Sequence, residues 1–100
     1  MAAEVIKVLH VDDEEGIVEL TKEFLALDGI ESRTTTDPRE AMRLAEEGGF
    51  DVLISDYQMP GMDGLELLGA LRGDGVRIPF ILFTGKGRED VAIRALNGGA

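Results

Sequence analysis

Acidic and hydroxyl side chains stand directly after three of the most apolar runs of the chain. Asp12 and Asp13 follow the first run, Asp56 follows the second, and the hydroxyl of Thr84 follows the third. Short apolar runs of this kind are typical of buried parallel strands. Because ligands of open parallel sheets bind at the carboxyl ends of the strands, we expect these four side chains to line one pocket.

Three carboxylates in one pocket predict a cation site and a nucleophile. Two like charges about 4 Å apart repel by roughly 4 kcal/mol at an effective dielectric near 20. Such a cluster takes a proton, raises a pKa or recruits a cation, and Mg²⁺ (or Mn²⁺) prefers oxygen ligands of this type. A carboxylate can also attack a phosphoryl group, with Asp56 as the candidate nucleophile. The hydroxyl of Thr84 and the backbone amide of Gly85 are candidate donors to the transferring oxygens.

The elements that must position these residues alternate between strand and helix. The predicted strands are 5–11, 30–35, 51–56 and 79–84, and the predicted helices are 15–27, 37 to 48, 63 to 73 and 88–96. This order predicts right-handed crossovers and a parallel α/β sheet. The second strand is the most polar of the four, which places it at an edge of the sheet.

Local signals fix the predicted helix ends and faces. Asp37 and Asp63 each stand three residues before a glutamate, Glu40 and Glu66, and both pairs predict capping boxes. Gly29 suits the C-terminal cap of the first helix. Apolar residues three or four apart predict amphipathic faces, namely Ile17, Leu20, Phe24 and Leu27 in the first helix and Leu65, Leu68 and Leu71 in the third.

Length and composition narrow the class of protein. One hundred residues predict one domain, spanning 1–100. The net charge of −10 argues against nucleic acid or an anionic membrane as a direct partner. With no cysteine, the chain can form neither disulfides nor a thiolate metal site. The sequence shows no run as long as a membrane span and no signal-peptide pattern, so we expect a cytoplasmic location.

The segment DYQMPGMDG at 56–64 carries the most specific pattern in the chain. Together with Asp12-Asp13 before it and Phe-Thr-Gly at 83–85 after it, this segment resembles the receiver domain of two-component response regulators. The resemblance covers nearly the whole chain in order and spacing. It implies a doubly wound parallel α/β sheet of the flavodoxin-like receiver fold, with strand order 2-1-3-4-5.

The resemblance also implies roles for the residues of the pocket. Asp56 would accept a phosphoryl group from the phosphohistidine of a histidine kinase. Asp13, Asp56 and the backbone carbonyl of Gln58 would ligate magnesium, with Asp12 acting through water. Thr84 would be the switch that reshapes the surface around the fourth helix and fourth strand, where an output domain or downstream partner binds. Such a protein is not an enzyme beyond catalysing its own phosphorylation and dephosphorylation.

The chain departs from the family pattern at its end. Receivers carry a lysine at the end of a fifth strand, and this sequence stops at 97–100, where that strand would begin. We interpret the chain as truncated, with strand order 2-1-3-4 and no fifth strand or fifth helix, and expect its phosphorylation to be impaired. The fourth strand then becomes an exposed edge, so we expect self-association through this strand or the fourth helix.

Two other functions are alternatives to the phosphoacceptor role. Phosphatases of the haloacid-dehalogenase type also form an aspartyl phosphate, but they carry a second aspartate two residues after the nucleophile, where this chain has Gln58. A receiver-like interaction module that is not phosphorylated stays open as the alternative. His10, inside the first strand, is interpreted as a packed side chain and not as a phosphohistidine.

Overall fold

The computed structural model of the chain describes residues 5–83. Its elements, in order, are β1 (Lys7–Val11), α1 (Glu15–Leu27), β2 (Glu31–Thr35), α2 (Pro38–Glu47), β3 (Val52–Asp56), α3 (Gly64–Gly73) and β4 (Phe80–Phe83). The predicted helix at 88–96 lies outside the described residues. Among the described helices, none is both long and apolar enough to cross a membrane.

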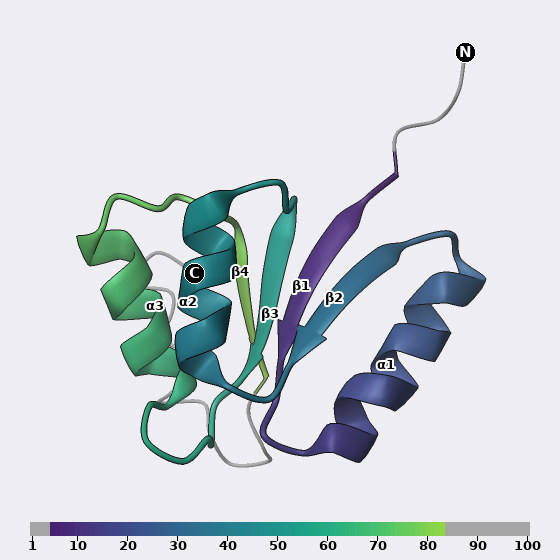
Figure 1. Ribbon diagram of the computed structural model, residues 1–100, viewed down its shortest axis with the longest axis horizontal. Coiled ribbons are helices and arrows are strands. Elements are labelled where there is room, and N and C mark those ends of the chain that lie inside the picture. Colours follow the sequence, from purple (N-terminus) through teal and green to yellow (C-terminus); the bar gives the residue numbers. More distant parts are fainter. Residues whose placement is uncertain (1–4, 84–100) are drawn as a thin grey trace.

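The four strands form one parallel sheet in the order β2-β1-β3-β4 (Figure 1). This is the order that the resemblance implied, and the polar strand β2 lies at an edge as predicted. The register pairs Leu9 of β1 with Arg33 of β2 on one side and with Leu53 of β3 on the other. The polar strand β2 therefore lies beside β1 on the side opposite the apolar strand β3.

The main core lies between the sheet and the helices α2 and α3. Its buried residues are Leu9, Val11, Ala41, Leu44, Ala45, Leu53, Met59, Leu67, Leu68, Leu71 and Phe80. Leu68 and Leu71 confirm the predicted stripe of α3, whereas Leu65 is only partly buried. Leu67, which the predicted stripe left out, is fully buried because α3 packs on both β4 and α2.

The packing of α1 corrects the interpretation of its apolar stripe. The helix forms over the predicted residues, and Gly29 follows it with a φ of 76°, as its predicted capping role requires. Val18 is its one buried residue, at 3 % exposure. The stripe itself is exposed, with Phe24 62 % and Leu27 82 % accessible. Amphipathic spacing therefore located the helix correctly, but no described element covers its apolar face.

The two predicted capping boxes differ in outcome. At α3, the Asp63 carboxylate accepts a hydrogen bond from the Glu66 amide at 2.8 Å, and the Glu66 side chain accepts one from the Asp63 amide at 3.0 Å. That box is confirmed. At α2, the Asp37 carboxylate accepts from the amide of Arg39 at 2.9 Å, so Asp37 caps the helix without the predicted contribution of Glu40.

Candidate functional site

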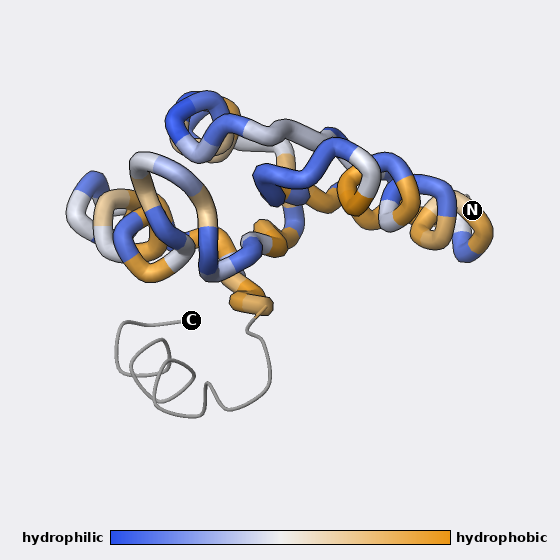
Figure 2. The backbone as a smooth tube through the Cα atoms, turned by 90° about the horizontal axis from the view of Figure 1, so that it is seen from below, coloured by the Kyte–Doolittle hydropathy of each residue, from blue (hydrophilic) through white to orange (hydrophobic). Residues whose placement is uncertain are grey.

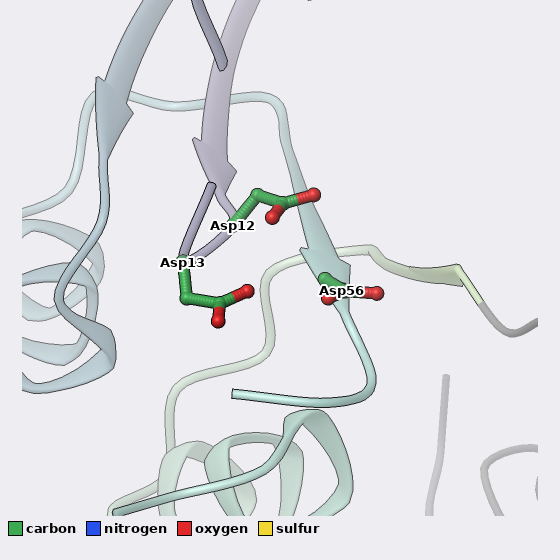
Figure 3. A group of neighbouring side chains, drawn as sticks. All are labelled: Asp12, Asp13 and Asp56. Atoms are coloured by element: carbon green, nitrogen blue, oxygen red, sulfur yellow. The ribbon is translucent and has the colours of Figure 1, made fainter. Parts of the chain in front are cut away.

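Two adjacent strands deliver three carboxylates to one point at the carboxyl edge of the sheet. Asp12 and Asp13 follow β1 directly, and Asp56 is the last residue of β3. Because β1 and β3 pair with Val11 opposite Ser55, their ends lie next to each other. One carboxylate oxygen of each aspartate lies within 4.8 Å of the others, and Figure 3 shows the three side chains grouped there. The predicted acidic cluster is confirmed for these three residues.

The three aspartates differ in burial and bonding. Asp12 is 9 % exposed, and its Oδ1 accepts a hydrogen bond from the Glu14 amide at 2.9 Å. Asp13 is exposed, and Asp56 is intermediate. The N-cap of α1 is Glu14, with no side-chain capping bond, so Asp13 does not serve as the helix cap. Asp13 and Asp56 are thus the accessible members of the cluster, with Asp12 held behind them.

The electrostatics of the cluster favour a bound cation or proton at Asp56. Burial raises the pKa of Asp56, and the neighbouring charges of Asp12, Asp13 and Glu14 raise it further, while a backbone hydrogen bond of Tyr57 acts in the opposite direction. Each cause that raises the pKa disfavours the ionised carboxylate. A divalent cation would relieve the repulsion without protonating the side chain.

The loop after Asp56 is held at both ends. The Tyr57 amide donates to the carbonyl of Phe83 at 2.9 Å, and the Tyr57 carbonyl accepts from the Gly64 amide at 2.9 Å. Met59 is 7 % exposed and anchors the loop in the core. Beside the cluster lies a hollow of about 410 Å³, lined by Asp13, Tyr57, Gln58, Met59, Pro60 and Asp63. Gln58 and Asp13 therefore line the same hollow, and metal ligation by the Gln58 carbonyl stays a prediction.

Gly64 is a structural position beside the site that the sequence reasoning did not single out. A Cβ at residue 64 would lie 2.6 Å from the backbone oxygen of Asp56 and 2.5 Å from Cδ1 of Leu82. Real Cβ atoms do not approach backbone this closely, so only glycine fits. The Asp-Gly pair at 63–64 was the available signal: Asp63 starts α3, and Gly64 lets that helix begin against the strand end that carries Asp56.

Thr84 and Gly85 lie outside the described residues, so their predicted roles stay predictions. The described part of β4 ends beside the cluster, because Phe83 pairs with Asp56. The strand that precedes Thr84, β4, is therefore the neighbour of β3, which ends in the predicted phosphoacceptor Asp56.

His10 is a packed residue of β1, as predicted. Its side chain is 1 % exposed, and its Nδ1 is buried without a hydrogen-bond partner in the described structure. Burial lowers the pKa of His10, and the charge of Asp12 only partly opposes this effect. A buried imidazole with a lowered pKa is neutral at neutral pH and adds no positive charge to the acidic cluster.

The donor set fits a small hard cation. Three carboxylates, two of them accessible, and a hollow that leaves room for water match the oxygen ligands and retained waters of Mg²⁺ or Mn²⁺. A parallel α/β sheet with an acidic pocket at its carboxyl edge defines the class of protein: a doubly wound domain with a carboxylate cluster that is consistent with a divalent-cation site.

Comparisons with known proteins place the chain within this class. The family model of the response regulator receiver domain matches residues 8–100. The chain therefore belongs to the response regulator receiver domain family, a family of signalling modules in two-component systems that receive signals from histidine kinases.

Individual relatives agree with this assignment. The C4-dicarboxylate transport transcriptional regulatory protein DctD of Pseudomonas aeruginosa is 35% identical over 94 residues, which are 94% of this chain and 20% of that protein. A response regulator receiver domain protein of Clostridium thermocellum has a similar structure, with a TM-score of 0.89 and 34% identity over 96% of this chain and 78% of that one. The chemotaxis response regulator CheY4 of Vibrio cholerae matches with a TM-score of 0.87 and 33% identity, covering 97% of this chain and 82% of its own. The chain thus spans about a fifth of the regulator DctD.

Proposed function

We propose that this chain is a phosphoacceptor domain in which Asp56 receives a phosphoryl group from the phosphohistidine of a histidine kinase. The observation that carries the proposal is the convergence of Asp12, Asp13 and Asp56 within 4.8 Å at the carboxyl edge of a receiver fold. Asp56 is the candidate nucleophile because it ends β3 and lines the accessible side of the cluster. Its carboxylate would attack phosphorus while the bond from phosphorus to the kinase imidazole breaks, and the imidazole keeps the electron pair of that bond.

The remaining residues would bind and orient the reactants. Asp13, Asp56 and the backbone carbonyl of Gln58 would hold Mg²⁺ or Mn²⁺, and Asp12 would act through water. When bound, the cation offsets the charge on the transferring oxygens. Asp12 is already fixed by its bond to the Glu14 amide, which keeps its charge directed at the cluster.

The same proposal extends to the output of the domain. Thr84 would move toward the new phosphoryl group, with the Gly85 amide as a donor, and the change would reach the surface around the fourth strand and fourth helix. That surface would contact an output domain or a downstream partner. The bond from the Tyr57 amide to the Phe83 carbonyl supports this route, because it joins the loop after Asp56 directly to β4.

Phosphoryl transfer to the isolated chain tests the proposal. The protein is incubated with acetyl phosphate and Mg²⁺, and the intact mass is measured with time. We expect a gain of one phosphoryl group that requires Mg²⁺ and is absent from Asp56→Asn, because the amide cannot act as the nucleophile. Without Mg²⁺ or Mn²⁺, the rate should fall at least about tenfold, since the repulsion within the cluster is then uncompensated.

The matched control is Asp74→Asn, which removes an exposed acid at the end of α3 outside the cluster. This variant should gain the phosphoryl group at the rate of the unchanged protein. A folded protein that gains no phosphoryl group under any of these conditions, including with a histidine kinase as donor, contradicts the proposal and favours the unphosphorylated interaction module.

A further inference from the structure

A second hollow lies at the amino-terminal end of the sheet, away from the acidic cluster. Its volume is about 390 Å³, and residues of α1, β1 and β2 line it. We call it the amino-edge hollow. β1 begins at Lys7, which lines this hollow, and ends at Val11, directly before Asp12. A strand of five residues spans about 16 Å, so the hollow and the acidic cluster lie at opposite ends of β1 (Figure 1).

Three cationic side chains line the amino-edge hollow, namely Lys7, Lys22 and Arg33, and Glu31 is the one acid among its lining residues. The chain as a whole has 20 acids against 10 bases, so the charge of this hollow is the reverse of the rest. All three cations are exposed, and none forms an ion pair within residues 5–83. Asp51 directs its carboxylate to the amide of Lys7 and does not line the hollow. Cations gathered without a counter-ion attract an anion.

The hollow wraps around the free edge of β2. Within the described residues, no strand lies beyond β2 in the order β2-β1-β3-β4. The Glu31 amide donates to the Ile6 carbonyl on the side of β1. Backbone groups of successive residues point to opposite sides of a strand, so the amide of Ser32 points away from β1. Ser32 lines the hollow, and its amide is therefore a further donor at this edge.

The hydroxyl of Ser32 has no partner. Its Oγ is buried and forms no hydrogen bond within the part of the chain that the structure describes. Buried polar atoms are nearly always hydrogen-bonded, and a buried one without a partner is costly. A ligand oxygen at the hollow would supply the missing partner. Ser32 can thus offer two donors, one from its backbone and one from its side chain.

The cations approach this edge from both faces of the sheet. Arg33 pairs with Leu9, a residue of the core under α2 and α3, so Arg33 lies on that face, and alternation places Lys7 there too. Lys22 comes from α1, which packs on β2 and contributes nothing to that core. Figure 2 shows hydrophilic residues along one edge of the α1 coil and hydrophobic residues along the other. The long side chains of lysine and arginine can converge on one ligand from these positions.

The rest of the lining is apolar. Ala26, Ile30 and Phe50 contribute to it, and Phe50 also packs against the main core. The volume of about 390 Å³ lies within the range of small-molecule sites, which is roughly 300–1,000 Å³. An inorganic anion would leave the apolar lining uncovered. A ligand with both a charged group and an apolar portion matches both parts of the hollow.

We propose that the amino-edge hollow binds a small organic anion in which a doubly charged phosphate-like or dicarboxylate group is attached to an apolar ring. The charged group would accept hydrogen bonds from Lys22, Arg33 and Ser32. The guanidinium of arginine suits such oxygens because it can donate two parallel hydrogen bonds. The ring would contact Phe50. This binding does not involve Asp56, so it is independent of the proposed phosphoacceptor role.

Titration with phenylphosphonate, followed by the backbone amide NMR signals of the chain, tests this proposal. The phosphonate cannot phosphorylate Asp56, because its phosphorus is bonded to carbon. A chelator removes metal ions that would draw it to the acidic cluster. We expect the signals of 30–33 to shift with a dissociation constant below about 1 mM at low salt, and the binding to weaken as salt is added. The signals of 56–57 should stay in place.

Substitutions at the hollow identify the donors. Lys22→Gln and Arg33→Gln each remove one positive charge, and each should weaken binding at least about fivefold, since hydrogen bonds to charged groups are the stronger ones. Ser32→Ala should weaken it about threefold through the lost hydroxyl. The matched control is Arg39→Gln, which removes an exposed positive charge from the first turn of α2, outside the hollow. This variant should bind within about twofold of the unchanged chain.

Two further probes separate the parts of the ligand. Phthalate carries two carboxylates on the same ring. Its binding relative to phenylphosphonate shows which of the two anionic groups the hollow prefers, and either preference supports the proposal. Inorganic phosphate should bind at least about fivefold more weakly than phenylphosphonate, because it leaves the apolar lining uncovered.

Three results overturn the proposal. The first is the absence of shifts at 30–33 with up to about 10 mM of both ring compounds. The second is binding that neither Lys22→Gln nor Arg33→Gln weakens. The third is inorganic phosphate that binds as tightly as phenylphosphonate, which would mean that charge alone attracts the anion.

Discussion

At the scale of single residues, the site is a set of like charges brought together by strand pairing. Asp12 is buried, Asp56 is half-buried and Asp13 is exposed. Their repulsion becomes large only because β1 and β3 end side by side. Burial is the largest cause that raises the pKa of Asp56, and the charges of Asp12, Asp13 and Glu14 raise this pKa further.

The raised pKa gives the folded protein a stability that depends on pH. The ordinary pKa of this carboxyl is 3.8, and the folded value is higher. Between the two values the folded state holds a proton that the unfolded chain has released, so stability falls as pH rises through this window. The loss then persists at neutral pH. Asp56→Asn removes the ionised carboxylate and with it this loss of stability. In the presence of a chelator, which keeps cations from the cluster, the variant should therefore unfold at a higher temperature than the unchanged protein at pH 7.

Thermal denaturation followed by circular dichroism measures this effect. The advantage of Asp56→Asn should narrow as the pH is lowered through the window and below 3.8, where the carboxyl becomes protonated in both states of the unchanged protein. Asp74→Asn, outside the cluster, should change the unfolding temperature equally at the two pH values. An Asp56→Asn variant that is no more stable at pH 7 would show that the cluster is not strained by its own charge.

At the scale of elements, the first turn of α3 packs against the end of β3, and only a glycine at position 64 leaves room for this contact. The capping box of Asp63 and Glu66 fixes the first turn of α3, and the Gly64 amide bonds to the Tyr57 carbonyl. The loop after Asp56 is closed by this contact. Backbone hydrogen bonds thus hold the loop that follows Asp56 and restrict the position of this candidate nucleophile.

Gly64→Ala tests this fit. The added Cβ would lie 2.6 Å from the Asp56 backbone oxygen, so the strand end or the helix must shift. We expect a loss of about 1–3 kcal/mol in the free energy of unfolding, as for other overpacked sites, and slower phosphorylation of Asp56. Urea denaturation and the acetyl phosphate assay measure the two effects.

The control for this change is another glycine of the same helix. Gly69 has open space where a Cβ would stand and no positive φ. Gly69→Ala should therefore stabilise the protein by about 0.5–1 kcal/mol, since alanine loses less backbone entropy in a helix. Equal effects of the two substitutions would rule out the close approach of α3 to β3.

At the scale of the whole molecule, the two faces of the sheet differ in how they are covered. Two helices, α2 and α3, bury one face, and α1 covers part of the other. Within residues 5–83, the main core therefore lies on the α2 and α3 side of the sheet, and the apolar stripe of α1 is exposed.

One leucine from each side of the sheet tests this asymmetry. Leu67 of α3 is 0 % exposed, and Leu27 of α1 is 82 % exposed. Leu67→Ala should lower the free energy of unfolding by about 2–5 kcal/mol, whereas Leu27→Ala should change it by no more than about 0.5 kcal/mol. Urea denaturation measures both effects. A large effect at Leu27 would mean that its surface is covered within one chain.

The sequence by itself determined the order of elements, the edge position of β2 and the three members of the acidic cluster. It could do so because these features depend on local patterns: short apolar runs, capping residues and acids placed directly at strand ends. The specific motif at 56–64 added the family. The predicted bounds of the first helix, 15–27, are those that α1 has in the structure.

Only the tertiary structure decided which apolar faces are covered. Periodicity showed that Ile17, Leu20, Phe24 and Leu27 share a side of α1, but burial depends on whether another element lies against that side. In the same way, Asp37 and Asp63 share one pattern, yet a reciprocal box forms only where the glutamate reaches back to the amide of the capping residue. Gly64 acquires its role from the closeness of the Asp56 oxygen, a contact between elements. Patterns along a chain fix local geometry, whereas coverage and close approach depend on elements that are distant in sequence.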